Sequence, residues 1–157
     1  PDEFRRSLDV FPAEYQALID HHVLIDGSDP LAGASIGEDD LRRACEAQAR
    51  GHLIHLRQGW VEHGAHSHGL IEVIEQSAGP LRQILSNLSR LDGESARDDA
   101  ALASFADRRI GMPEALVPSV LNLEQAPHQA RTLVPRLPDY LAACERLWAF
   151  SDAWRAR

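Results

Sequence analysis

Residues 38–63 carry the sequence feature that most constrains the fold, an apolar stripe with the period of an α-helix. Its members recur at steps of three or four residues, so they share one face of a helix with about 3.6 residues per turn. Acidic side chains begin the segment and Gly64 follows it, which is typical of a helix's first turn and of its C-terminal cap. The sequence therefore predicts one continuous helix here. The stripe consists of Leu41, Cys45, Ala49, His52, Leu56, Trp60 and His63.

Further segments with apolar faces at helical spacing occupy most of the remaining chain. One of them must kink or split at Gly79-Pro80, because Pro80 has no amide hydrogen for the preceding turn. Ser95 is predicted to cap the next helix, Pro113 to start a short one, and residues 122–130 to form a loop. Five to six amphipathic helices with short connections predict an all-α helical bundle. Besides 38–63, the predicted helices cover residues 13–25, 68–91, 95–108, 113–121 and 136–155.

The N-terminal segment differs from the rest. Residues 4–12, FRRSLDVFP, read as a short strand in which apolar residues alternate and a proline ends the ladder. A lone strand cannot satisfy its backbone hydrogen-bonding groups. We therefore expect residues 1–14 to be a short extended stub left from a neighbouring sheet, and residues 15–157 to be the bundle domain. Because the chain begins at Pro1 and its only methionine is Met112, we also expect a piece of a longer protein.

Composition excludes several classes of protein. The 157-residue chain has a net charge of −8 at pH 7, which argues against a surface that follows nucleic acid phosphates. It has no apolar run long enough to span a membrane. Its two cysteines, Cys45 and Cys144, form no C-x-x-C pair and lie on apolar helix faces, as inert thiols of a reducing compartment do. We expect a cytoplasmic protein.

One stretch has the outline of a nucleotidyltransferase signature. Gly27-Ser28 is followed by an acidic cluster at residues 38–40. A working site needs its Gly-Ser between a strand and a helix, and its carboxylates on one face of a following strand, where they hold Mg²⁺. Here a proline interrupts the spacer and the acids begin a helix, in which alternate residues point about 200° apart. We interpret the stretch as a turn and a helix start.

Two parts of the chain nevertheless resemble a bacterial nucleotidyltransferase-like family. SLDVFPAEY, HHVLIDGSDPLAG and DLRRACEAQARGHLIHLRQGW, all within about residues 1–62, are similar to the middle of these proteins, where a polymerase-β-like palm is followed by a helical domain. LPDYLAACERLWAFSDAW is similar to the last bundle helix of kanamycin nucleotidyltransferase and its relatives, whose helical domain helps form the substrate cleft. The resemblance implies a C-terminal helical domain that binds substrate or a partner and is not catalytic by itself.

The same resemblance implies where the chemistry lies. This chain lacks the palm's Gly-Ser and Asp-x-Asp elements, so Mg²⁺ and a nucleotide triphosphate are expected for the parent protein and no cofactor for this chain. An upstream palm domain is the expected partner, and only its last strand would remain, within residues 1–14. Such strands place a third carboxylate between apolar residues, as in Leu8-Asp9-Val10. Asp9, or else Glu14, is the implied catalytic metal ligand or base; the alternative is an ordinary solvated acid.

Arginines on the long helix are the first candidates for substrate binding. Arg43, Arg50 and Arg57 lie seven residues apart and share one face. Such a row suits nucleotide phosphates or the acids of an adjoining domain. His22, placed before a turn that faces a cleft between domains, is the fourth predicted substrate-binding residue. The alternative for the row is a solvated face with ion pairs along the helix, such as Glu46–Arg50.

Two other interpretations come from other classes of protein. One is a stand-alone helical-bundle metal-binding protein, because neutral imidazoles bind Zn²⁺ or Ni²⁺ well. It requires histidines from several helices to converge, whereas we favour a buried, hydrogen-bonded His52 and assign no metal ligand. The other is an interaction module that forms a homodimer through exposed aromatic faces. The histidines concerned are His22, His52, His55 and His128, and the cluster of His63, His66 and His68.

Overall fold

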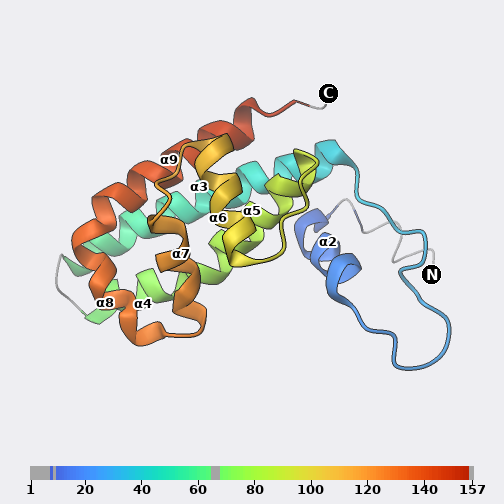
Figure 1. The fold of residues 1–157 in the computed structure, drawn as a ribbon, viewed down its shortest axis with the longest axis horizontal. Coiled ribbons are helices and arrows are strands. Elements are labelled where there is room, and N and C mark those ends of the chain that lie inside the picture. The colour runs from blue at the N-terminus through green and yellow to red at the C-terminus, as the bar shows by residue number, and fades with distance from the viewer. Residues whose placement is uncertain (1–7, 9, 65–67, 156–157) are drawn as a thin grey trace.

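The computed structural model describes residues 8, 10–64 and 68–155, which form an all-α helical bundle (Figure 1). Six α-helices of seven residues or more occur in this part of the chain, and no strand does, which confirms the predicted fold class. None of these helices has the length and hydrophobicity needed to cross a bilayer.

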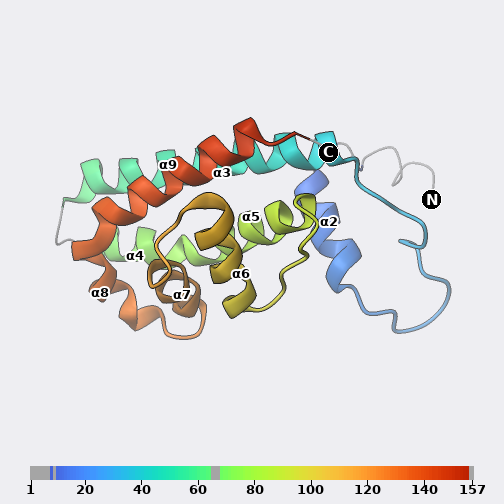
Figure 2. The ribbon, with the colours of Figure 1, turned by 45° about the horizontal axis from the view of Figure 1, so that its top comes forward.

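The longest helix, α3 (Glu38–His63), organises the bundle and has the predicted bounds. It packs against α9 (Leu137–Ala153) and, on another side, against α4 (His68–Gln76) and α5 (Ala78–Leu91). Figure 2 shows α3 and α9 running side by side above α4 and α5. The predicted stripe is buried from Leu41 to Leu56 and partly buried at Trp60, but His63 is exposed, so its assignment to the stripe was wrong.

Both cysteines lie in the core that this packing creates. Cys45 and Cys144 are free and fully buried. Burial raises the pKa of the Cys45 thiol to about 12 and raises the pKa of Cys144 as well. Both thiols therefore stay protonated and unreactive near neutral pH, which confirms the prediction of inert buried cysteines.

The break between α4 and α5 falls at Ser77, three residues before Pro80. Pro80 is the third residue of α5, and the first amides of a helix have no intrahelical acceptor, so proline costs little there. The amide of Ser77 donates to the carbonyl of Ile74 at 3.2 Å across the break. A split was thus correctly predicted, and its position follows from the tolerance of a helix's first turn for proline.

The next segment starts and ends later than predicted. Helix α6 (Asp99–Phe105) is capped by Asp98, whose carboxylate accepts from the amide of Ala101 at 2.8 Å; Ser95 does not cap it. A π-helical turn, Ala106–Ile110, continues it. Helix α7 begins at Leu116 and not at Pro113, and ends at Leu121 as predicted.

The predicted loop over residues 122–130 contains short turns of helix. Two 3-10 turns, Asn122–Glu124 and Pro127–Gln129, lead into α8 (Ala130–Leu133), and a third turn, Val134–Arg136, joins α8 to α9. Leu123 and Ala130 are buried. This burial holds the segment on the core, where its backbone must find internal hydrogen bonds.

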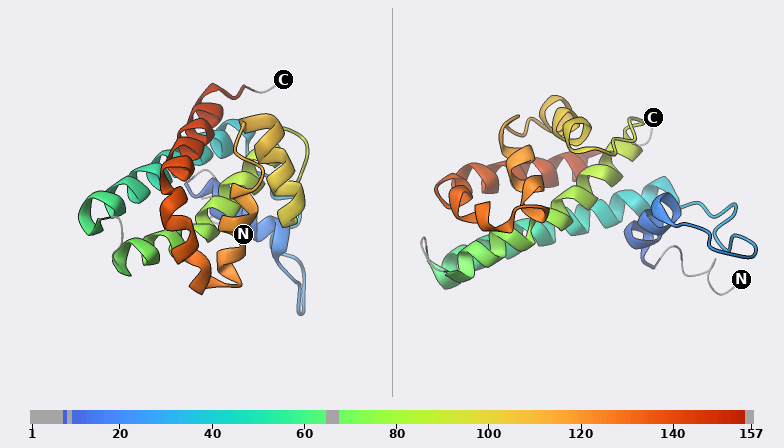
Figure 3. Two further views of the ribbon diagram at one scale, coloured as in Figure 1. Left: turned by 60° about the vertical axis from the view of Figure 1, so that its left-hand side comes forward. Right: turned by 60° about the horizontal axis from the view of Figure 1, so that its bottom comes forward.

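Helix α2 (Pro12–His21) begins earlier and ends earlier than predicted. Residues 22–25 are not helical, and residues 22–37 reach away from the bundle as a long loop (Figures 1 and 3). Residues 1–7 and 9 of the predicted strand lie outside the described residues. Val10 and Phe11 form a turn and bend before α2, so the strand was wrong for residues 10–12. The assignment of residues 1–14 to a neighbouring palm stays a prediction.

Candidate functional site

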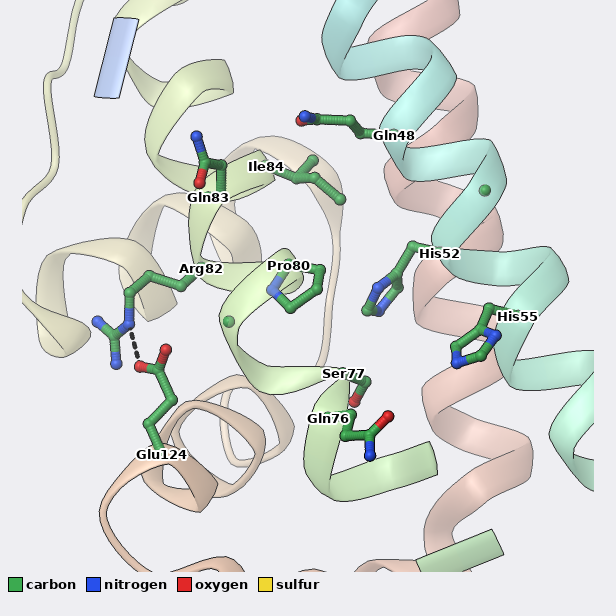
Figure 4. Close-up of a pocket in the computed structure, with 12 residues that line it drawn as sticks. Gln48, His52, His55, Gln76, Ser77, Pro80, Arg82, Gln83, Ile84 and Glu124 are labelled. Carbon is green, nitrogen blue, oxygen red and sulfur yellow. Dashed lines mark hydrogen bonds and ion pairs between the residues drawn. The ribbon is translucent and has the colours of Figure 1, made fainter. Parts of the chain in front are cut away.

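A cavity of about 690 Å³ lies between α3 and α5 (Figure 4). This volume is within the range of roughly 300–1,000 Å³ that small-molecule pockets have. Helix α3 forms one wall, and the break between α4 and α5 forms the other. The polar lining side chains are Gln48, His52, His55, Gln76, Ser77, Arg82, Gln83 and Glu124.

Helical spacing explains why α3 presents several polar groups to the cavity. Gln48, His52 and His55 follow one another at steps of four and three, so they share one face. Glycines widen the space between the walls. A Cβ on Gly51 would meet nothing within 4 Å, and one on Gly79 would lie 3.4 Å from Oε1 of Glu124. The cavity therefore has polar side chains and room beside them.

A chain of hydrogen bonds runs from His52 into the core. Nε2 of His52 lies 2.9 Å from the hydroxyl of Tyr140, which lies 3.1 Å from Oγ of Ser77. The Ser77 hydroxyl donates to the carbonyl of Ile74 at 2.6 Å. Because Ser77 uses its one hydrogen in this way, its oxygen accepts from Tyr140, whose own oxygen must then accept from Nε2 of His52.

This direction fixes the tautomer of His52. Its hydrogen is on Nε2, and Nδ1 keeps a free lone pair. The side chain is 7% exposed, and burial, helped by the nearby charge of His55, lowers its pKa to about 4. His52 is therefore neutral near pH 7 and acts as a hydrogen-bonding group; a general base works best with a pKa near the operating pH. Its burial and bond to Tyr140 confirm the prediction of a core histidine.

The charged groups beside the cavity are already paired. Arg82 donates to Glu124 and to Asp99, each at 2.5 Å. The hydrogen bond to Asp99 and then that to Glu124 outweigh burial and raise the pKa of Arg82. Arg82 is held by two carboxylates, so it is not a free cation that could bind an anionic ligand.

None of the predicted substrate-binding arginines lines this cavity. Arg43 bonds to Asp40 at 2.5 Å on its own helix. Toward α9, Arg50 lies 5.7 Å from the ring of Trp148 and Arg57 pairs with Glu145. These contacts agree with the alternative interpretation, in which Arg43, Arg50 and Arg57 lie on a solvated helix face and pair with neighbouring side chains. A role of these arginines in substrate binding stays a prediction.

His22 lies on a different part of the molecule. Its Nδ1 is 3.1 Å from the carbonyl of Leu18, and its Nε2 is 3.1 Å from the carboxylate of Asp29. Burial lowers the pKa of His22, but the hydrogen bond and charge of Asp29 outweigh it, so the pKa is raised. With both nitrogens facing acceptors, the ring links the end of α2 to the following loop, and its protonated form can donate to both.

Of the two predicted catalytic acids, only Glu14 lies among the described residues. Asp9 lies outside the described residues. Glu14 is exposed in the first turn of α2 and does not line the cavity. Their catalytic role stays a prediction that follows from the resemblance.

The histidines do not converge as a metal-binding protein would require. His22 and His128 do not line the cavity beside His52 and His55, so the convergence that this alternative requires is not seen among the described residues. At the start of α4, His68 pairs with Glu72 at 3.3 Å, and His66 lies outside the described residues. In the described residues, no group of three or more potential ligands is placed to hold a metal ion.

Large exposed apolar side chains are concentrated in the N-terminal part of the described chain. Of the eight large apolar side chains that are exposed among the described residues, six lie between residues 10 and 25. Ile25 is 96% exposed and Val23 is 83% exposed. We call this set the apolar N-terminal surface. It consists of Val10, Phe11, Leu18, Val23, Leu24 and Ile25.

Sequence reasoning missed the polar partners in the cavity. Gln48 carries no local signal, and Tyr140 fits the apolar stripe of α9, so its hydroxyl gives no hint of a partner. A break at Gly79-Pro80 was predicted, but not the contact of the buried Ser77 side chain with Tyr140. No protein-family model, curated protein or solved structure matches this chain, so the function is argued from its own residues.

Proposed function

We propose that this chain is the helical substrate-binding domain of a nucleotidyltransferase-like protein and that it does not transfer nucleotides by itself. The cavity between α3 and α5 is the observation that carries the proposal. It has the size of a small-molecule pocket, and helices supply its polar side chains from fixed positions.

The positions of the two resembling segments support the same conclusion. DLRRACEAQARGHLIHLRQGW forms most of α3, and LPDYLAACERLWAFSDAW forms α9. These helices are far apart in sequence and pack side by side (Figure 2). Helix α3 provides a wall of the cavity, and α9 provides Tyr140, which positions His52. In the family, the corresponding helical domain helps form the substrate cleft.

The apolar N-terminal surface supports a neighbouring folded domain. Large apolar side chains left exposed on a protein surface mark sites of interaction where they gather together. The resemblance implies that a palm domain adjoins this end of the chain, and that palm would bring Mg²⁺ and the nucleotide triphosphate. The same surface also favours the second candidate function, an interaction module that pairs with another copy.

A transfer assay tests the proposed lack of catalysis. The chain is incubated with Mg²⁺, with nucleotide triphosphates labelled on the α-phosphate, and with sugars, amino sugars and nucleosides as acceptors. We expect no labelled product. Robust transfer by the chain alone would show that it contains its own catalytic site.

A binding experiment tests the cavity. The same acceptors are added to ¹⁵N-labelled protein, and amide chemical shifts are followed by NMR. We expect shifts at residues around the cavity and their loss in Gly51→Phe, because residue 51 has free space in which a phenyl ring narrows the cavity. Shifts confined to another surface, or equal binding by Gly51→Phe, would contradict the assignment.

A further inference from the structure

We infer that the cavity binds the hydrogen-bond-donating part of its substrate, a hydroxyl- or amino-bearing group without negative charge, through Nδ1 of His52 and Oε1 of Gln48. The inference rests on the proposed function, which makes this cavity the substrate site. It adds the direction of the hydrogen bonds: the protein supplies acceptors here, and the ligand supplies donors.

His52 is the principal acceptor because its surroundings fix where its hydrogen lies. The chain through Tyr140 and Ser77 holds that hydrogen on Nε2. Among the described residues, none donates a hydrogen bond to Nδ1. The side chain is 7% exposed and lines the cavity. Figure 4 shows the His52 ring among the side chains that line the cavity, and we assign its unprotonated nitrogen as the acceptor for a ligand there.

Gln48 supplies a second acceptor one helical turn earlier on the same face of α3. Its Oε1 is buried and, within the described part of the chain, has no hydrogen-bond partner. A buried acceptor without a donor is costly, so a donor brought by a ligand is favourable. Figure 4 shows the side chain extending from α3 toward Gln83 and Ile84 on α5. Rotation of its terminal amide, which is a soft torsion, turns the oxygen toward a ligand.

An anionic group is disfavoured at this position for two reasons. The lone pairs of His52 and Gln48 would face its negative charge, and protonation of His52 is opposed by a pKa of about 4. Arg82, whose side chain lines the cavity, is already bonded to Glu124 and Asp99. The phosphates of a nucleotide must then bind elsewhere, and the cavity is left for the molecule that accepts the nucleotide.

The first experiment needs no ligand. The side-chain nitrogens of His52 are observed at pH 7 by ¹⁵N NMR, which distinguishes a protonated ring nitrogen from an unprotonated one. We expect the hydrogen on Nε2 and none on Nδ1. A hydrogen on Nδ1, or a doubly protonated ring, would overturn the inference that Nδ1 is a hydrogen-bond acceptor. The proposed function would not be affected by this result, because the transfer assay and the cavity experiment test it separately.

The second experiment compares ligands of opposite polarity. Glucose and glucosamine are titrated at pH 7 against inorganic phosphate, with Nδ1 of His52 as the reporter. We expect both sugars to shift Nδ1 and phosphate to leave it unchanged. A shift with phosphate in place of the sugars, or no shift with any of the three at tens of millimolar, would overturn the inference.

Gln48→Leu and Gln58→Leu are the matched variants for this titration. Both replace a glutamine of α3, but only Gln48 lines the cavity, and Gln58 is exposed. Loss of one hydrogen bond should weaken sugar binding roughly fivefold in Gln48→Leu. Gln58→Leu should bind as the original protein does. Equal affinities for both variants would remove Gln48 from the site.

Discussion

His52 and His22 place the same side chain in opposite electrostatic settings. His52 is buried, lies near His55, and has a pKa lowered to about 4. His22 is exposed, faces the carboxylate of Asp29, and has a pKa raised above its ordinary 6.5. The pH dependence of stability therefore has opposite signs for the two residues.

For His52 we predict a loss of stability as the pH falls. Below an unfolded-state pKa of about 6.5, the unfolded chain binds a proton that the folded chain refuses until about pH 4. The free energy of unfolding should fall across this window by roughly 3 kcal/mol from this residue. Urea unfolding at pH 7 and pH 4.5 measures the loss, and His52→Gln should show a correspondingly smaller one. Equal losses in both proteins would contradict the low pKa.

For His22 the sign is reversed. Its stabilising contact with Asp29 is fully present below pH 6.5 and is lost as the pH rises through the raised folded-state pKa. His22→Gln should therefore lose more stability relative to the original protein at pH 6 than at high pH, where the ring is neutral in both the folded and the unfolded chain. A larger difference at pH 8, measured by the same urea unfolding, would contradict a protonated His22.

At the level of elements, the regular apolar period made α3 predictable. Its stripe is long, acids begin it and a glycine ends it, so several local signals agree. Shorter helices depend on tertiary contacts that local signals do not contain. Asp98, and not Ser95, caps α6, and residues 122–130 fold into turns because Leu123 and Ala130 are buried. The predicted helix bounds were therefore wrong where tertiary packing or a competing capping residue determines them.

The contact between α3 and α4 leads to a prediction about two glycines. A Cβ on Gly59 would lie 2.8 Å from Cγ1 of Val73 and 3.1 Å from its Cβ. Valine cannot turn away easily, because its χ1 is restricted. We expect Gly59→Ala to destabilise the protein by roughly 1–2 kcal/mol, since the overlap exceeds the gain in helix propensity.

Gly51→Ala is the matched control on the same helix. A Cβ at Gly51 meets nothing within 4 Å, so only the gain in helix propensity remains. This variant should be more stable by about 0.5–1 kcal/mol. Thermal and urea unfolding of Gly59→Ala and Gly51→Ala measure these two changes in stability. If Gly59→Ala were stabilised as much as Gly51→Ala, α3 and α4 would not approach as closely as described.

At the level of the whole molecule, the candidate site depends on contacts between distant parts of the chain. The Tyr140 hydroxyl bonds to His52, 88 residues away, and to Ser77, 63 residues away. Helical periodicity tells which face of each helix is buried, but not which residues meet across two faces. The sequence therefore identified His52 as a core histidine, whereas the cavity around it required the assembled bundle.

The apolar N-terminal surface supports the last prediction, that the free chain associates with itself. Val23 is 83% exposed and Ile25 is 96% exposed, and both belong to this set, whereas Val61, which is 84% exposed on α3, does not. Each covered apolar Å² gains about 25 cal/mol, so association that covers the set is favourable.

The test replaces exposed valines and isoleucines with serine. Val23→Ser combined with Ile25→Ser should lower the association seen by light scattering, and Val61→Ser should not. The free energy of unfolding should stay within about 0.5 kcal/mol in both variants, because these side chains are already in water. Equal effects of the two variants would show that the N-terminal set is not a docking surface, and the support that it gives to a neighbouring palm domain would be lost.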